Sequence, residues 1–327
     1  MKSMAIIGAG MAGLSLARQL QDKFSIQVFE KSDMVGGRMA SYTFDKYQFD
    51  IGAQFFIAHS PPFKTFLKPY IKQGVVARWD ACFVEMEHDR ITQKWDWDEE
   101  YPHYVATPTM TALTTAMSTD LSLRMNTSIN EIKRMKNGWE LFDINSQSMG
   151  TFDWVVTAVP AQQATGLLPS DFAYYSAISR RELIGCYSLM LGFKQPLSIP
   201  WDAALVKNAD ISWVCNNHSK PNRPEGYYSL LIHATNSWAD KNMFMSDKEV
   251  IEYLIKETSS VLQFDVSLAD YINLHRWQYA NISRHEEYRS CIDKSLQLAA
   301  IGDWCIKGRV EAAYLSALNA SEKILMK

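Results

Sequence analysis

The sequence predicts an α/β fold built on a parallel sheet, and two observations predict it. At the start of the chain, residues 4–30 read as an apolar run, a glycine-rich turn, a helical pattern and a second apolar run that ends in an acid. Much later, residues 153–159 and 298–301 are almost entirely apolar, as strands are when both faces of a parallel sheet are covered. The chain is therefore predicted to begin in this sheet and to return to it twice.

The turn reads Gly8-Ala9-Gly10-Met11-Ala12-Gly13, and each glycine has a physical task. Gly8 permits a tight turn, Gly10 removes a side chain where a pyrophosphate approaches the backbone, and Gly13 lets helix and strand pack closely. Free amides at the helix start face the phosphates, where the helix dipole favours negative charge. Glu30 follows Gly8 by 22 positions, close to the roughly 20 expected of an acid that binds a ribose hydroxyl. This stretch predicts dinucleotide binding.

A secretory signal peptide is the alternative for this stretch, because Lys2 precedes apolar and small residues. The glycines interrupt the would-be apolar segment, so we reject export. The net charge of −3 gives no electrostatic case for nucleic acid or an anionic membrane, and no apolar run approaches the roughly 20 residues that span a bilayer. Five cysteines without a C-x-x-C pair indicate reduced thiols and a cytoplasmic location.

Two more segments near the N-terminus suggest close contact with a bulky ligand. Gly36-Gly37-Arg38-Met39 pairs two small residues with an arginine, whose fork of donors suits phosphate. Asp50-Ile51-Gly52-Ala53-Gln54-Phe55 combines small residues with an amide that can bind the edge of a planar ring. A simple turn with a solvated arginine is the alternative for the first segment.

The middle of the chain predicts a second domain. Asn137-Gly138 between two β patterns predicts a type I′ hairpin, and Ser246-Asp247-Lys248-Glu249 is a capping box that opens a helix. His275-Arg276-Trp277 is dense in aromatic and donor groups. Further helices are expected at 63–71 and 109–117, and further strands within 75–84 and at 186–193, 212–215 and 229–235.

Gly302-Asp303 lies at the carboxyl end of the last apolar run, and a helical pattern starts at Val310. In an open α/β sheet, ligands bind beyond the carboxyl ends of the strands. Asp303 is therefore placed to accept hydrogen bonds from polyol hydroxyls, and the amides of the last helix can stabilise anionic charge. A solvated acid and an ordinary terminal helix are the alternative.

Together these motifs resemble the flavoprotein family that includes the amine oxidases and, more closely, renalase and its bacterial relatives. The residues that carry the resemblance are Gly8 to Gly13, Gly36 to Met39, Asp50 to Phe55, His275 to Trp277, Gly302 to Cys305, Gly308 to Glu311 and Leu315-Ser316. The first two motifs are general to this class of FAD proteins, and the others are more specific to the renalase-like branch.

The resemblance implies an α/β fold with a Rossmann-type FAD-binding domain and a second, substrate domain of mixed sheet and helices. The expected FAD domain is discontinuous, with residues 1–60, 103–163 and 290–327, and the substrate domain takes 61–102 and 164–289. FAD is expected to be bound non-covalently. The expected cofactor-binding residues are Gly8, Ala9, Gly10, Met11, Ala12, Gly13, Glu30, Lys31, Gly37, Arg38, Met39, Gly52, Ala53, Gln54, Phe55, Ile129, Ala158, Gly302, Asp303, Arg309, Val310 and Glu311.

The resemblance also implies a FAD-dependent oxidase that converts 2- and 6-dihydro isomers of NAD(P)H to NAD(P)+. Hydride passes to flavin N5, and O2 is reduced to H2O2. A FAD-dependent amine oxidase, an NAD-dependent dehydrogenase and a non-catalytic flavin-binding interaction scaffold are the alternatives. The expected partners are a small-molecule substrate and O2, without nucleic acid, membrane or metal. The substrate-face candidates are Trp213, His233, His275, Trp277 and Trp304, and core packing is the alternative for each aromatic side chain.

Overall fold

The computed structural model describes residues 1–283 and 288–326. It divides into two compact units, both discontinuous in sequence. The first comprises Met1–Arg38, Thr114–Leu183 and Ile282–Lys327, and the second comprises Met39–Leu113 and Ile184–Asn281. The domain ranges expected from sequence stay a prediction; they differ from these units in assigning residues 39–60 and 103–113 to the FAD domain and residues 164–183 and 282–289 to the substrate domain. Residues 284–287 and 327 of those ranges lie outside the described part of the chain.

The first unit is built on a six-stranded sheet in which five neighbouring strands are parallel. Its order is β10 (Leu123–Arg124), β2 (Phe24–Phe29), β1 (Lys2–Ile7), β14 (Trp154–Thr157), β21 (Leu298–Ala300) and β20 (Cys291–Asp293). Three stretches of sequence thus meet in one sheet, with only β20 antiparallel. This arrangement confirms the predicted α/β class.

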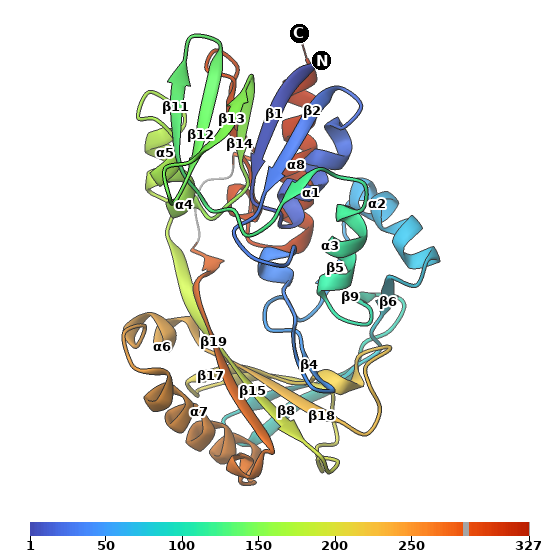
Figure 1. Ribbon diagram of the computed structural model, residues 1–327. Coiled ribbons are helices and arrows are strands. Elements are labelled where there is room, and N and C mark those ends of the chain that lie inside the picture. Colours follow the sequence, from blue (N-terminus) through green and yellow to red (C-terminus); the bar gives the residue numbers. More distant parts are fainter. Residues whose placement is uncertain (284–287, 327) are drawn as a thin grey trace. The chain divides into compact units, whose positions relative to one another are not determined.

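Helices α1 (Met11–Leu20) and α8 (Val310–Leu325) pack against each other, and α1 also contacts β1 and β2 (Figure 1). Both helices bury alanines, namely Ala12 and Ala17 in α1 and Ala312, Ala313, Ala317 and Ala320 in α8. Residues 4–7 of β1 and all of β14 are buried, as their apolar sequence predicts. The shorter helices of this unit are α4 (Ala161–Leu167) and α5 (Tyr175–Ser179).

A second, antiparallel sheet of the first unit contains β11 (Ile129–Met135), β12 (Gly138–Asp143) and β13 (Ser148–Phe152). The predicted hairpin is present, because Met135 pairs with Gly138. The predicted type I′ turn centred on Asn137-Gly138 is wrong. The turn residues are Lys136 and Asn137, and Gly138, with a φ of 130°, already begins the next strand.

The second unit is built on a seven-stranded sheet. Its order is β19 (Tyr271–Ile282), β15 (Leu183–Phe193), β18 (Tyr228–Ala234), β17 (Ile211–Asn216), β16 (Ala203–Lys207), β7 (Cys82–Glu87) and β8 (Arg90–Asp96). Its smaller sheets contain β3 (Tyr42–Phe44), β4 (Tyr47–Phe49), β5 (Phe56–Ile57), β6 (Val76–Arg78) and β9 (His103–Ala106). Its helices are α2 (Pro61–Lys72), α6 (Asn236–Lys241) and α7 (Asp247–Leu262), while α3 (Thr111–Ser118) spans the boundary between the units. Helix α7 begins at the predicted capping box.

Alternation along the central strands of this sheet creates two different faces. Leu189 and Ile232 belong to the large apolar core that includes residues of α6 and α7. Met190 and Leu231 point the other way, into a smaller cluster with Tyr47, Phe49 and Ile51. The segment that follows β4 therefore lies across the face of the sheet opposite to α7.

Candidate functional site

The glycine turn of the first unit connects β1 to α1, and two of its glycines are required by the chain itself. Gly8 has a φ of +107°, and a Cβ on it would lie 2.7 Å from the carbonyl oxygen of Ala158. A Cβ on Gly13 would lie 2.0 Å from the carbonyl oxygen of Gly8. Real Cβ atoms do not approach backbone oxygens this closely, so these positions admit only glycine in this backbone. Ala158, a predicted cofactor residue, closes the turn from the end of β14.

Gly10 differs, because nothing in the first unit fills the place of its side chain. Its backbone is in the ordinary extended region, with a φ of −81°, and a Cβ would meet only the carbonyl oxygen of Gly36 at 3.9 Å. The amide of Gly36 donates to the carbonyl of Ala9 at 3.0 Å, so the second glycine loop lies against the first. The space over Gly10 at the start of α1 therefore fits the approach of a pyrophosphate.

Glu30 is buried at the end of β2 and holds this turn. One carboxylate oxygen accepts the amide of Ala9 at 2.8 Å, and the other accepts the amide of Ser32 at 3.0 Å. A carboxylate offers about four acceptor positions, so each oxygen keeps one for a ribose hydroxyl. The neighbouring Lys31 is exposed.

Arg38 and Asp303, expected to bind separate parts of a ligand, form a bidentate ion pair with each other. Nη1 of Arg38 lies 3.0 Å from Oδ2 of Asp303, and Nη2 contacts Oδ1. The pair joins the second glycine loop to the loop after β21, within the first unit. If Arg38 or Asp303 binds a ligand, it does so while it also forms this ion pair.

The structure corrects the prediction for Trp304. Its side chain is 1% exposed, and its indole Nε1 donates to the carbonyl of Val159 at 2.9 Å. Trp304 is a core residue of the first unit and lines no substrate face. Nearby, the amide of Gly302 donates to Ser316 Oγ at 3.1 Å, which fixes the start of the loop.

The remaining predicted cofactor residues of the first unit occupy varied positions. Ile129 is buried at the start of β11, Arg309 is the exposed residue before α8, and Val310 and Glu311 form the first turn of that helix. No structural feature distinguishes their ligand roles, which stay predictions.

In the second unit, the carbonyl oxygen of Ile51 receives three side-chain donors from three strands. Ser188 Oγ of β15 lies at 2.7 Å, Trp277 Nε1 of β19 at 2.9 Å and His233 Nε2 of β18 at 3.3 Å. Ser188 and His233 are direct cross-strand partners, and His233 is also opposite Trp213 of β17. Nε2 of His233 and Nε1 of Trp277, two side chains predicted to face substrate, therefore hold the backbone at Ile51.

Next to Ile51, Asp50 is buried with two cations. Its Oδ2 lies 2.9 Å from Lys220 Nζ and 2.6 Å from Arg223 Nη2, and all three side chains are at most 1% exposed. Its Oδ1 accepts from Ser41 Oγ at 2.8 Å and from the amide of Met110 at 2.9 Å. Burial alone raises the pKa of Asp50, but Lys220 and Arg223 more than offset this and hold the pKa well below its usual range. The acid is ionised, so Asp50, Lys220 and Arg223 together carry one net positive charge.

Gln54 does not offer its amide outward as predicted. Its nitrogen donates to the carbonyls of Asp50 and Gly52, the latter at 2.9 Å, and its oxygen accepts from Lys220 Nζ at 3.3 Å. The amide of Gln54 therefore bonds back to the backbone of its own segment. Gly52 and Ala53 remain half-exposed between buried neighbours, and this is the part of residues 50–54 that can meet a ligand.

Phe55 continues this segment into a group of aromatic rings. Its ring centroid lies 4.8 Å from that of Trp97, 5.0 Å from His103 and 5.7 Å from Trp213. The indole nitrogen of Trp213 is buried without a hydrogen-bond partner among the described residues. The half-buried rings of His103 and Trp213 are tilted by 58° and 38° against the half-buried ring of Phe55, which follows Gly52 and Ala53 closely in the chain.

The two predicted histidines of this face are neutral at physiological pH. Burial lowers the pKa of His233 to about 4, and its hydrogen bond to Ile51 only partly opposes this. Burial likewise lowers the pKa of His275, whose ring lies 4.3 Å from Trp277 in an edge-to-face contact. Both are weak bases at most.

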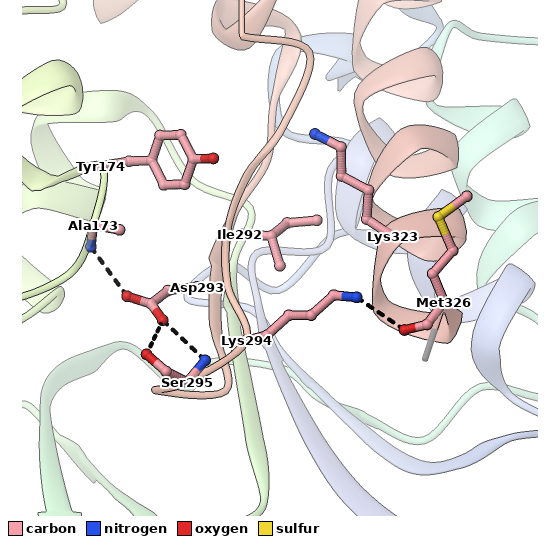
Figure 2. Close-up of a pocket in the computed structure, with 8 residues that line it drawn as sticks. All are labelled: Ala173, Tyr174, Ile292, Asp293, Lys294, Ser295, Lys323 and Met326. Atoms are coloured by element: carbon pink, nitrogen blue, oxygen red, sulfur yellow. Dashed lines mark hydrogen bonds between the residues drawn. The ribbon is translucent and has the colours of Figure 1, made fainter.

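A cavity of about 620 Å³ in the first unit is separate from these groups (Figure 2). It lies beside β20 and the last turn of α8, at the end of the sheet opposite to Gly302, because Asp293 pairs with the first residue of β21. Its polar groups bind one another: Asp293 accepts from Ala173 and Ser295, and Lys294 donates to the carbonyl of Met326. None of the predicted site residues lines it.

Sequence reasoning missed the side chains that hold the Asp50 segment, namely Ser188, Asn217, Lys220 and Arg223. One signal was available: an acid between apolar residues 47–51 requires a partner if the segment is buried. The sequence does not say which cation, because Lys220 is 170 positions away. Across residues 1–283 and 288–326, no helix is long and apolar enough to cross a membrane, and no group of three His, Cys, Asp or Glu side chains is arranged to hold a metal ion.

Two protein-family models match the sequence. Residues 6–70 match the NAD(P)-binding Rossmann-like domain, and residues 73–325 match the flavin containing amine oxidoreductase family. Among curated proteins, the 1-hydroxycarotenoid 3,4-desaturase of Flavobacterium sp. (strain P99-3) is 42% identical over 57 residues, 17% of this chain and 12% of that protein. The coproporphyrinogen III oxidase of Staphylococcus aureus (strain NCTC 8325 / PS 47) is 39% identical over 59 residues, 17% of this chain and 13% of that one. The chain thus aligns with about an eighth of the length of these relatives.

Solved structures resemble the whole chain. A protein assigned as a protoporphyrinogen oxidase from Exiguobacterium sp. 255-15 has a TM-score of 0.80 at 11% identity, covering 99% of this chain and 98% of that one. A putrescine oxidase bound to putrescine has a TM-score of 0.74 at 12% identity, covering 100% and 99%. At these identities the likeness concerns the fold alone.

Proposed function

The chain belongs to the flavin-containing amine oxidoreductase family, and from that premise we propose a renalase-like oxidase of dihydronicotinamide dinucleotides. Membership makes the protein a FAD-dependent oxidoreductase. The proposed reaction converts the 2- and 6-dihydro isomers of NAD(P)H to NAD(P)+ by hydride transfer to flavin N5, with O2 reduced to H2O2. Non-covalent binding of FAD is part of the proposal.

We assign the cofactor contacts residue by residue. In the first unit, the amides after Gly10 bind the pyrophosphate, Glu30 binds the adenosine ribose, and the amides of Val310 and Glu311 stabilise negative charge. In the second unit, Gly52 and Ala53 approach the flavin ring. The observation that supports the first assignment is the space over Gly10, where an added Cβ would meet, within 4 Å in the described chain, only the carbonyl oxygen of Gly36.

The aromatic side chains around Phe55 are evidence for a planar substrate. Half-buried aromatic rings stack with a dihydropyridine ring, and the neutral His233 and His275 add no charge. Oxidation of a dihydropyridine restores an aromatic ring and needs no strong protein base. The contribution of the protein is then to position the hydride donor in a site that excludes water. Aromatic and weakly basic side chains are suited to lining such a site.

The net positive charge of Asp50, Lys220 and Arg223 argues against the amine-oxidase alternative. A protonated amine brought to Gly52 and Ala53 would approach a buried surplus cation, whereas an electron-rich, phosphate-bearing dinucleotide would not be repelled. Many amine oxidases also carry a lysine-x-tryptophan near the flavin. Here the comparable residues are His275 and Trp277, with Arg276 turned away to Asp247 at 2.6 Å.

The test is anaerobic mixing of purified, flavin-loaded protein with borohydride-reduced NAD, which contains several dihydro isomers. Rapid bleaching of the flavin absorption supports the proposal. Bleaching by amines alone would transfer the assignment to an amine oxidase, and bleaching by neither would favour a flavin-binding scaffold. Colourless protein that takes up no FAD would contradict both oxidase assignments.

A pair of variants tests the substrate surface. Phe55→Leu removes an aromatic ring beside Gly52 and is expected to raise KM for the dihydronicotinamide while flavin remains bound. Phe244→Leu makes the same change at a fully exposed position of the second unit and is expected to leave KM unchanged. Equal effects of the two variants would remove Phe55 from the substrate surface.

A further inference from the structure

The half-exposed residues Gly52 and Ala53 combine two features that favour electron-rich groups. Within the described chain, the amides of Gly52, Ala53 and Gln54 donate no hydrogen bond to another protein group, and the first two carry no bulky side chain. Directly behind them lie Asp50, Lys220 and Arg223, which we call the Asp50 cluster.

The surplus charge of the Asp50 cluster is not cancelled nearby. Within the described chain, Asp50 is the only carboxylate in an ion pair with Lys220 or Arg223. Asp202 is half-buried, and its side chain accepts the amide of Cys82 at 2.8 Å and forms no ion pair with either cation in the described chain. Arg223 Nε is buried without a partner in the same part of the chain. One positive charge therefore remains, in surroundings of low dielectric constant.

The cluster does not touch a ligand, because its side chains are at most 1% exposed. Its influence reaches the surface through Gln54, whose oxygen accepts from Lys220 and whose nitrogen donates to the carbonyl of Gly52. Charge at such a buried position acts over several ångströms with little screening by salt. Burying a surplus cation also costs folding free energy. An electrostatic function would explain why the chain retains it.

We infer that the Asp50 cluster stabilises negative charge on the flavin ring when that ring is reduced beside Gly52 and Ala53. Lys220 is the positioning residue: it supplies the charge and orients Gln54 without meeting the ligand. This inference rests on the proposed function only in placing the flavin ring at these residues. It does not depend on which substrate supplies the electrons.

The experiment measures the midpoint potential of the bound flavin, and in parallel the dissociation constant of its sulfite adduct, because both report stabilisation of negative charge on the ring. Lys220→Met keeps the length of the side chain and removes the surplus charge. We expect a more negative potential, equivalent to about a tenfold lower ratio of reduced to oxidised flavin at a fixed solution potential, and sulfite binding weakened by about as much.

Asn217→Asp gives the same result by another route and protects the test against misfolding of the first variant. Asn217 Oδ1 already accepts from Lys220 Nζ at 2.9 Å and from the amide of Asp50 at 3.2 Å, so a carboxylate there cancels the surplus and keeps the packed side chain, at the loss of the hydrogen bond from Nδ2 to the carbonyl of Gln48 at 2.9 Å. Lys207→Met is the matched control, since it removes an exposed lysine paired with Glu85 in the same unit. The control is expected to keep the potential of the unaltered protein.

Unchanged potentials in both Lys220→Met and Asn217→Asp would overturn the inference. So would loss of flavin from both folded variants, because the cluster would then have a structural role only. A raised KM for the phosphate-bearing substrate at an unchanged potential would also overturn it and make the cluster a substrate-anion site. Failure of the unaltered protein to oxidise dihydronicotinamides refutes the proposed substrate instead, and leaves the potentials fully interpretable.

Discussion

Two short segments, one in each unit, carry the proposed cofactor contacts, and they are built in opposite ways. The turn at Gly8–Gly13 is shaped by what its residues lack, and its partners are close in sequence or lie at the ends of adjacent strands. The segment from Asp50 to Gln54 is shaped by side chains from strands and loops more than 130 positions away. The conformation of the glycine turn depends on the absence of side chains next to the backbone, and that of the Asp50 segment depends on buried polar contacts.

The comparison teaches where each segment is vulnerable. At Gly8 and Gly13 of the glycine turn, a single added methyl group would lie 2.7 Å and 2.0 Å, respectively, from a backbone oxygen. In the Asp50 segment, three donors share one carbonyl, so the loss of one leaves two. Substitutions at Gly8 and Gly13 should therefore reduce stability in an all-or-none way, and those in the Asp50 segment should reduce it in small steps.

The largest effect is expected for Gly13→Ala. Its Cβ would lie 2.0 Å from the carbonyl oxygen of Gly8, which forces α1 away from β1. We expect a loss of about 3–5 kcal/mol in the free energy of unfolding, the range of severe backbone and overpacking changes. Chemical denaturation of the purified variant measures it. A loss below about 1 kcal/mol would show that helix and strand separate easily, contrary to the comparison.

Gly10→Val is expected to abolish flavin binding while the fold persists. The side chain enters the space over Gly10, where an added Cβ would meet only the carbonyl oxygen of Gly36 within 4 Å, so it blocks the pyrophosphate while its Cβ fits the described chain. The checks are the flavin content after purification and the melting temperature of the apoprotein against apoprotein of the unaltered chain. Full flavin occupancy would show that the phosphates lie elsewhere.

The sequence revealed the first segment far better than the second, for physical reasons. Glycine spacing, the apolar strands and Glu30 are local features, and the parallel sheet they predict is present. Trp304 was misjudged because an aromatic side chain near a predicted site reads the same whether it faces a ligand or the core. Lys220 was missed because ion pairs between distant residues leave no periodic trace, and only the tertiary fold brings its ammonium to Asp50.

An acid-induced loss of stability is expected from His233. Its folded pKa of about 4 lies below the ordinary value near 6.5, so in this interval the unfolded chain binds a proton that the folded chain does not. The free energy of unfolding therefore falls as the pH is lowered from about 6.5 to about 4, by up to about 3 kcal/mol, and this contribution is constant below. His233→Gln keeps a donor for Ile51 and should flatten the dependence, measured by melting temperatures across this range.

His59→Gln, at an exposed position of the second unit, is the control for this pH dependence. It is expected to keep the slope of the unaltered protein. If His233→Gln keeps the slope as well, the acid sensitivity of the second unit arises from another group, and His233 is not the buried neutral base described above.

The smallest effect is expected for Trp277→Phe. The substitution deletes the donor to Ile51 at 2.9 Å, while Ser188 and His233 continue to hold the same carbonyl. We expect a loss of about 1 kcal/mol in the free energy of unfolding beyond the loss of packing, the usual net value of one hydrogen bond.

Trp213→Phe is the matched variant, because it removes the same atoms from an indole whose nitrogen has no partner in the described chain. The difference between the two melting temperatures isolates the hydrogen bond. A much larger loss in Trp277→Phe would mean that the three donors act as one cooperative unit, and the Asp50 segment would then be as intolerant of single changes as the glycine turn.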